Sequence, residues 1–456
     1  MNIIIVGCGK VGQALTEQLS SEGKHDITII DLNRAILQNI ANTNDVMGIA
    51  GNGTSFSVLQ EAGIDVADIL IAVTNSDELN LLCCVIAKKS RSKIATIARV
   101  RSHSYFKEIS YLRESLGIAM IINPELMAAT EIARLLRFPN AIEISTFAKG
   151  RVELMTFRLG ESNPMNQMAL SHVVSHFKAN IVVCAVERNH QVFIPNGNFI
   201  FEVNDIVSIV ATPQNSSDFF KKIKVKTHMV KNAMLVGGGT TAHYLALQLL
   251  NIGIDVKIVE KDIRRCEELC ELLPKAMIIN GAGINHDLLL EEGLEQCESF
   301  VALTGNDEEN LFLSMFAGTK SAGKLVTKIN RLNYDEVIER LNLGSIVCPK
   351  QLTAQYIVQF VRAKQNSLGS NVENVYRILE NKAEALEFYI QPNCPQPLLE
   401  TPLEKLKLRS NLIVAMIIRG NQVILPRGQD EFHIGDHVIL VSSGNTIMDI
   451  MDILKK

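Results

Sequence analysis

The chain has 456 residues and a formal net charge of −4. Its length exceeds what one ordinary hydrophobic core needs and indicates two to four domains. The slightly acidic balance gives no general electrostatic reason for nucleic-acid binding, so we expect no nucleic-acid partner. None of the nine cysteines forms a CxxC pair, which is typical of reduced thiols in a cytosolic protein and not of a disulfide framework.

The hydrophobic content of 47% with no tryptophan is typical of parallel sheets built from Ile, Val, Leu and Ala. The longest uninterrupted apolar run, Leu412 to Ile418, is far shorter than the roughly 20 residues that cross a bilayer. The apolar segment at the N-terminus is short and runs into glycines, unlike a signal peptide. We therefore expect no transmembrane segment.

The opening stretch predicts a strand, a tight turn and a helix. Residues 2–6 favour a strand, the next six read G-C-G-K-V-G, and the apolar residues that follow have helical spacing. A G-x-G-x-x-G motif in this setting is typical of a dinucleotide site, where the N–H groups that open the helix face a diphosphate. The candidate residues for that role are Gly7, Cys8, Gly9, Lys10, Val11 and Gly12.

An acidic residue supports this interpretation. Asp31 closes the next apolar run, 19 residues after Gly12, where a ribose-binding carboxylate is expected. The alternative is a glycine turn with an incidental aspartate at the end of a strand. Cys8 lies inside the loop, where helix N–H groups could lower its thiol pKa and permit redox sensing, although a small filler residue is the simpler interpretation.

Strands and helices then alternate along the first part of the chain. Strands are expected at 46–50, 69–73, 94–100 and 118–122, with helices at about 34–41 and 77–89. This rhythm predicts a doubly wound, Rossmann-like parallel sheet, whose ligands bind at the carboxyl ends of the strands. The residues at those ends that are candidates for the ligand cleft are Gly51, Asn52, Gly53, Thr54, Thr74, Asn75 and Arg99.

A helix from Pro124 to about Arg137 ends the first α/β segment, and the texture then changes to short alternating strands. We interpret residues 140–222 as a small α+β lobe. The chain then starts over: Gly237 repeats Gly7 at an offset of 230, and Glu260 answers Asp31 at an offset of 229. The repeat predicts four domains at 1–138, 140–222, 231–363 and 372–456, in the order α/β, lobe, α/β, lobe.

The second half differs from the first at several candidate positions. Ala282 replaces Asn52, Ile284 replaces Thr54, and Ile329 stands 230 residues after Arg99, with Lys328 and Arg331 nearby. We expect two nucleotide sites of unequal quality, the first being stronger. The candidate residues of the second site are Gly237, Gly238, Gly239, Thr240, Thr241, Glu260 and Gly281.

Catalytic groups are missing beside either loop. No tyrosine is followed by a lysine four residues on, and no HExxH arrangement is present, so neither a catalytic nor a metal site is expected. A duplicated dinucleotide fold without a catalyst favours a sensor, in which a ligand shifts a conformational equilibrium. An NAD-dependent oxidoreductase and a scaffold that binds no nucleotide are the two alternatives.

The order of the four domains, the GCGKVG loop followed by Asp31, the loop 51–54 and the segment 72–78 resemble the tandem regulator-of-potassium-conductance (RCK or KTN) family. The resemblance covers essentially the whole chain. It implies a non-enzymatic cytoplasmic regulator, peripheral on the inner membrane face, that forms a homo-oligomeric ring under a separate potassium-translocating membrane protein.

The resemblance also assigns ligands and roles. It implies NAD(H) as the ligand, with ATP or ADP in relatives, the glycine loops on the diphosphate, Asp31 and Glu260 on ribose, and Arg99 on phosphate. It further implies that the last helix of each α/β domain, 124–137 and 349–362, crosses to a neighbouring α/β domain. The apolar stripe of either helix is explained equally well by burial in its own domain.

Overall fold

The computed structural model describes residues 1–102, 109–137, 141–225, 229–321, 323–330, 343–366, 372–379, 382–392, 394, 398–399, 401–444, 447 and 449–455. The expected domain ends at 138 and 140, and Arg331, lie outside this part of the chain. The chain forms two compact units. The first contains Met1–Ala133 and Lys231–Val361, and the second contains Arg134–Val230 and Arg362–Lys456.

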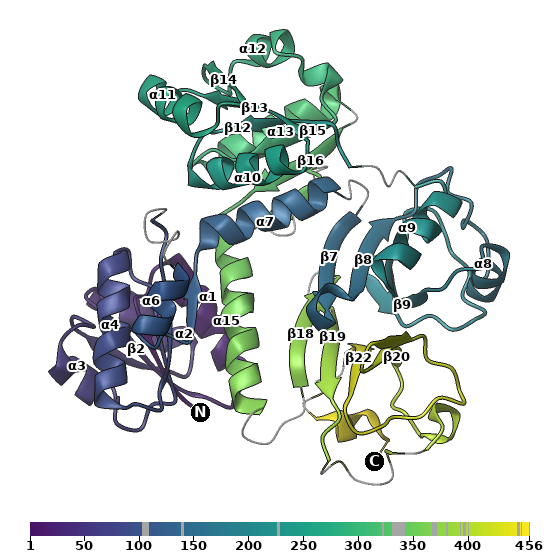
Figure 1. The fold of residues 1–456 in the computed structure, drawn as a ribbon, viewed down its shortest axis with the longest axis horizontal. Helices are drawn as coiled ribbons and strands as arrows, with labels where there is room; N and C mark the ends of the chain where they lie inside the picture. Colours follow the sequence, from purple (N-terminus) through teal and green to yellow (C-terminus); the bar gives the residue numbers. More distant parts are fainter. Residues whose placement is uncertain are drawn as a thin grey trace. The chain divides into compact units, whose positions relative to one another are not determined.

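The first unit holds two six-stranded parallel sheets, which confirms the predicted Rossmann-like class (Figure 1). The first sheet has the order β3-β2-β1-β4-β5-β6. Its strands are β1 (Asn2–Val6), β2 (Asp26–Asp31), β3 (Met47–Ala50), β4 (Ile69–Ala72), β5 (Ala95–Arg99) and β6 (Met120–Ile122). Its helices are α1 (Lys10–Ser20), α2 (Arg34–Thr43), α3 (Phe56–Glu61), α4 (Asp77–Ser90), α6 (Ile109–Ser115) and α7 (Pro124–Arg137).

The second sheet repeats this topology in the order β14-β13-β12-β15-β16-β17. Its strands are β12 (Asn232–Val236), β13 (Asp255–Glu260), β14 (Met277–Asn280), β15 (Ser299–Ala302), β16 (Lys324–Lys328) and β17 (Ser345–Val347). Its helices are α10 (Thr240–Asn251), α11 (Ile263–Leu272), α12 (His286–Glu291), α13 (Asp307–Lys320) and α15 (Pro349–Asn366).

The central strands are buried on both faces, which explains their unbroken apolar runs. Ile3, Ile4 and Ile5 are each no more than 1% exposed. Consecutive residues of a strand point to opposite faces, so a sheet covered by helices on both sides requires apolar residues throughout. Short αβ and βα connections then bring the carboxyl ends of all six strands to one edge.

The last helix of each α/β domain packs on the other domain. Four residues of α15, Ala354, Ile357, Val358 and Val361, belong to the apolar core of the first domain. Thr130 of α7 accepts a hydrogen bond from Gln248 of α10, so α7 lies along the second domain (Figure 1). The crossing implied by the family resemblance is therefore present within this unit, between the two halves of one chain.

The second unit holds two five-stranded antiparallel sheets. The first, in the order β10-β9-β11-β8-β7, contains β7 (Ala141–Phe147), β8 (Val152–Arg158), β9 (Val182–Arg188), β10 (Gln191–Phe193) and β11 (Ile206–Ala211), with helices α8 (Leu170–His176) and α9 (Pro213–Lys222). The other, in the order β18-β19-β22-β20-β21, contains β18 (Val372–Ile378), β19 (Ala383–Tyr389), β20 (Leu412–Arg419), β21 (Gln422–Ile424) and β22 (Asp436–Ser443). One apolar cluster joins the two sheets. Across the described parts of the chain, no helix has the length and apolar character that a membrane span requires.

Candidate nucleotide sites

The first glycine loop connects β1 to α1 and leaves the start of the helix open. Gly7 has φ +101°, a backbone conformation that L side chains rarely adopt, and its N–H donates to the Ile30 carbonyl at 2.8 Å. Gly9 caps α1 without any side-chain hydrogen bond, and a Cβ placed there would meet no atom within 4 Å. The first N–H groups of α1 therefore face free space, as an anion-binding helix terminus does.

Asp31 is held directly beside this loop. Its Oδ2 accepts from the Cys8 N–H at 2.7 Å, and its Oδ1 accepts from the Asn33 N–H at 2.8 Å. The two bonds fix the carboxylate between the loop and the start of α2, while each oxygen keeps a lone pair for another donor. This is the placement that a ribose diol requires in a dinucleotide fold.

Several candidate residues of the loop can offer only backbone groups. Cys8 is fully buried, and Val11 is 6% exposed. Burial, followed by the nearby Asp31 carboxylate, raises the pKa of Cys8 to about 12. The expectation that the helix N-terminus could lower this pKa is therefore wrong, because desolvation of the thiolate outweighs the attraction of the N–H groups. Lys10, in contrast, is exposed at the start of α1.

The loop after β3 forms a rigid turn next to the glycine loop. Asn52 accepts hydrogen bonds from the Thr54 N–H at 3.0 Å and from its hydroxyl at 2.9 Å. Gly53 is buried, and a Cβ at this position would lie 2.2 Å from Cγ1 of Val6. The turn thus packs against the end of β1 and presents Asn52 to solvent, together with the half-exposed Gly51.

A buried asparagine ties the ends of β4 and β5 together. Asn80 is fully buried, accepts from the Thr74 N–H at 2.8 Å, and donates to the Arg99 carbonyl at 2.9 Å. Sequence reasoning used Asn80 only to measure the repeat. Its recurrence as Asn310, at the same offset as the glycine loops, was the signal that could have marked it as part of the site.

Arg99 lies at this junction with its guanidinium turned toward the chain itself. Its Nη2 donates to the Thr74 carbonyl, and to Oδ1 of Asn75 at 3.3 Å. Arg99 is 8% exposed, and burial, more than the neighbouring Arg101, lowers its pKa. Its contact with a phosphate stays a prediction.

Arg101 and Asp77 extend the cleft wall and were missed from the sequence. Arg101 donates from Nη2 to the Asn75 carbonyl at 2.7 Å, and its own N–H donates to Oδ2 of Asp77 at 2.8 Å. Asp77 stands at the first turn of α4, which favours an acidic side chain. A cation and an anion therefore flank Asn75 at the mouth of the first site.

The second glycine loop has the same anchors. Gly237 has φ +104°, and Glu260 accepts from the Gly238 N–H at 2.6 Å and from the Asp262 N–H at 2.9 Å. Gly239, like Gly9, caps its helix with free space around its Cβ position. Thr240 is exposed at the start of α10, whereas Thr241 is 7% exposed and offers mainly its backbone.

The cation of the second site is Lys328, and the comparison of Ile329 with Arg99 is wrong by one residue. Asn310 donates to the Lys328 carbonyl at 3.0 Å, as Asn80 does to Arg99. The connector before β16 is one residue shorter than the one before β5, so the offset falls to 229. Lys328 donates from Nζ to the Leu303 carbonyl at 2.9 Å, and Ile329 is buried. Burial lowers the pKa of Lys328.

Other groups around the second site are less polar than in the first. Ile284, in place of Thr54, is 69% exposed. Gly281 is half exposed and packs against Leu288, as Gly51 packs against Val58. Arg265 of α11 donates from Nε to the Gly238 carbonyl at 2.8 Å and has no counterpart in the first site, where Ile36 occupies the equivalent position at an offset of 229.

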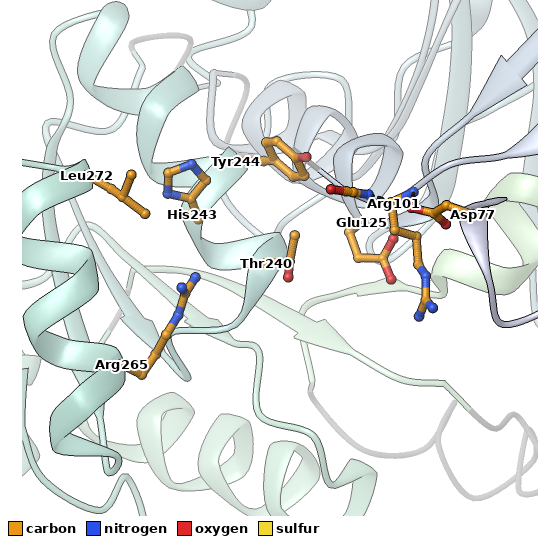
Figure 2. Close-up of a pocket in the computed structure, with 9 residues that line it drawn as sticks. Asp77, Arg101, Glu125, Thr240, His243, Tyr244, Arg265 and Leu272 are labelled. Carbon is orange, nitrogen blue, oxygen red and sulfur yellow. Dashed lines mark hydrogen bonds between the residues drawn. The ribbon is translucent and has the colours of Figure 1, made fainter. Parts of the chain in front are cut away.

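A cavity of about 430 Å³ opens where α10 begins, and both halves line it (Figure 2). Thr240, His243, Tyr244, Arg265 and Leu272 come from the second half, and Asp77, Arg101, Ser102 and Glu125 come from the first. In Figure 2 the Tyr244 ring lies toward the group from the first half. The second site is thus continuous with a space whose far wall belongs to the first domain.

Family models match both halves of the chain. The TrkA-N domain matches residues 3–124 and 233–349, and the TrkA-C domain matches residues 154–224 and 386–455. The paired matches coincide with the two parallel sheets and the two antiparallel lobes. Together they cover well over half of the chain.

Curated relatives match over nearly the full length. The chain is 30% identical over 447 residues to the Trk system potassium uptake protein TrkA of Haemophilus influenzae, covering 97% of this chain and 96% of that protein. It is likewise 30% identical to TrkA of Halomonas elongata, covering 96% and 95% of the two chains, and to TrkA homolog 1 of Methanosarcina mazei, covering 99% of each.

Solved structures share the fold at low sequence identity. A structure described as the GsuK channel bound to NAD covers 97% of this chain and 77% of its own, with a TM-score of 0.63 and 13% identity. The GsuK RCK domain covers 97% of this chain and 92% of its own, with a TM-score of 0.63 and 14% identity. At this identity the likeness establishes the tandem RCK fold alone.

Proposed function

Because the chain belongs to the family of Trk system potassium uptake proteins TrkA, we propose that it controls a separate Trk-type potassium-translocating membrane protein by binding nucleotides. As a member of this family it is a regulatory protein of potassium uptake and not an enzyme. We keep the proposed domain boundaries at 1–138, 140–222, 231–363 and 372–456.

We propose NAD(H) as the ligand of the first site, with ATP or ADP as the alternatives. The observation that carries this is the Asp31 carboxylate, fixed by the Cys8 N–H beside a glycine loop whose helix terminus is open. Gly7 to Gly12 would hold the diphosphate, Asp31 the ribose, and the strand ends at 51–54, 74–75 and 99 the rest of the cleft. The NAD-bound GsuK structure shows that a protein of this fold can take that ligand.

The binding test uses purified full-length protein and titration calorimetry with NADH, NAD, ATP and ADP. We expect saturable binding of at least one of them, which Asp31→Ala weakens strongly. If no adenine nucleotide bound at concentrations of roughly one millimolar, the proposed function would be wrong.

The membrane partner, the ring and the location are further parts of this proposal. We propose a homo-oligomeric ring, held from the cytoplasmic side against the potassium-translocating subunit. Light scattering should give a mass several times that of one chain, and purification from membranes should recover the transporter together with the chain. Deletion should impair growth at low external potassium, and unchanged uptake would refute the transport role.

A further inference from the structure

The two seams that join the α/β domains of the first unit differ in chemistry. Where α15 meets the first domain, the contact is apolar and includes Ala14 of α1. Where α7 meets the second domain, the contacts are polar: Asn123 Nδ2 donates to the Tyr244 hydroxyl at 3.3 Å, and Gln248 donates to Thr130 at 3.1 Å. Ala14 is the counterpart of Tyr244, at the offset of 230, so duplication alone does not explain the polar seam.

Asn123 is the centre of this polar seam. It is 3% exposed, and its Oδ1 accepts from the Leu126 N–H at 2.9 Å, which caps the start of α7. Its amide carries two N–H donors, one directed at the Arg101 carbonyl at 3.4 Å and the other at Tyr244. In the second half the residue before the corresponding proline is Cys348, which cannot make these bonds.

On one side the chain of contacts reaches the first nucleotide site. Arg101 donates to the Asn75 carbonyl at 2.7 Å, and Asn75 also accepts from Arg99. Asn75 stands directly after Thr74 at the mouth of the cleft. A ligand that moves this wall must therefore also shift Arg101, whose carbonyl is bound by Asn123.

On the other side the contacts reach the second site. Tyr244 lies one turn into α10, which begins at Thr240, and the His243 N–H donates to the Gly239 carbonyl at 3.1 Å. Tyr244 and Arg101 also line the cavity that opens at this helix start (Figure 2). A phosphate at the second loop would thus act on the helix that carries the Tyr244 hydroxyl.

We propose that Asn123 and Tyr244 are positioning residues that couple the two nucleotide sites, so that filling one changes the affinity of the other. The inference rests on the proposed function. Coupling of this kind is reciprocal, because it is one free energy shared by both ligands. It also reaches the start of α7, the helix whose chain continues into the first antiparallel lobe.

The experiment measures a coupling factor, defined as the dissociation constant of one site with the other filled, divided by that with the other disabled. Gly9→Asp and Gly239→Asp each disable one site, and NADH and ATP are the probes, followed by calorimetry on the full chain. We expect a factor that differs from one by about fivefold or more. Because the readout is a ratio, a change in one site's own affinity cancels.

Two variants remove the link without removing the helix cap or the ring. Tyr244→Phe deletes only the hydroxyl, and Asn123→Ser keeps a capping oxygen but cannot reach Tyr244. Each should bring the factor to within about twofold of one, and the double variant should do no more, because both break one contact. Gln248→Ala is the control, since it breaks the neighbouring bond of the same seam and should keep the wild-type factor.

The outcomes separate the inference from its premise. Two sites that bind independently in the wild type, or a factor that survives in both Tyr244→Phe and Asn123→Ser, would overturn the coupling alone. Loss of coupling in Gln248→Ala to the same extent would also overturn it, because the seam would then act by general packing. Absence of nucleotide binding at both sites would refute the proposed function as well.

Discussion

The two nucleotide sites share their framework and differ in what they present to a ligand. In both, a carboxylate at the end of the second strand accepts from the middle of the glycine loop, and a buried asparagine ties two strand ends together. The exposed groups differ: Lys10 is replaced by Thr240, Asn52 by Ala282, and Arg99 by Lys328.

This difference separates two roles of a polar residue in such a fold. Groups that hold the backbone are the same in both halves, since an unpaired buried N–H or carbonyl costs free energy whether or not a ligand is present. Groups that only meet the ligand can drift after duplication without loss of the fold. The comparison therefore predicts two sites that are equally well built and unequal in affinity.

The largest effect should come from placing a negative charge at either helix start. Gly9→Asp and Gly239→Asp should each lower the affinity of their own site by roughly 100-fold or more, through repulsion of the phosphates. Neither Cβ meets an atom within 4 Å, and aspartate is a favoured N-cap, so the fold should be retained. Calorimetry with NADH and ATP, together with thermal melting, checks both statements.

Asparagine at the same positions is the matched control, because it has the size of aspartate without the charge. An equal loss in Gly9→Asn would mean that the side chain blocks the loop sterically, which would contradict an anion at this helix terminus. A loss that appeared at the other site would contradict the assignment of one loop to each site.

Removal of the carboxylates should have the next largest effect. Asp31→Ala should weaken the first site by about 10- to 100-fold, because charge-assisted bonds to ribose are lost and the Cys8 N–H loses its acceptor. Glu260→Ala should do the same at the second site, measured in a Gly9→Asp background. If one replacement had no effect on binding, the carboxylate in that half would serve the backbone alone.

Much of this framework could be predicted from the sequence because its signals are local. Glycines before a helical pattern, an acid at a strand end and a repeat at a constant offset each follow from a few neighbouring residues. Lys328 was missed because one residue is lost in a connector, which moves every later comparison by one position. Only the hydrogen bond from Asn310 identifies the true counterpart of Arg99.

Contacts between distant segments could not be predicted from the sequence. An apolar stripe on α15 requires burial but does not say against which domain, and Asn123 before a proline looks like an ordinary cap. The short helix α6 (Ile109–Ser115) was also missed between two expected strands. The direction of the Cys8 pKa shift depended on burial, which the loop motif does not encode.

The cations of the two sites should respond differently to pH. Burial lowers the pKa of Lys328, so its charge is lost below the usual lysine range of about 10.4, whereas the Arg99 guanidinium stays charged. NADH affinity at the second site should therefore fall by up to about tenfold as the pH rises from 7.5 toward 10, with little change at the first. Lys328→Arg should remove this dependence.

The sign of the stability effect is opposite, which distinguishes ligand binding from unfolding. A lysine with a lowered pKa in the folded state destabilises the fold while it is charged, and this cost is relieved as the pH rises through the folded pKa. The contribution of Lys328 to the free energy of unfolding should thus increase while affinity decreases. A parallel fall in both for the wild type, unchanged in Lys328→Arg, would contradict the assignment.

The smallest effect concerns the residue that separates the first two glycines, Cys8 in one half and Gly238 in the other. With its pKa raised to about 12 by burial and by Asp31, the Cys8 thiol is almost entirely protonated at pH 8 and cannot act as a nucleophile. Iodoacetamide should label the exposed Cys270 and leave Cys8 unmodified, as read by peptide mass spectrometry, and mild peroxide should not change NADH affinity. Labelling of Cys8 in the folded protein at a rate near that of Cys270 would make the loop a redox sensor after all. Otherwise the difference between Cys8 and Gly238 is one of packing beneath the loop.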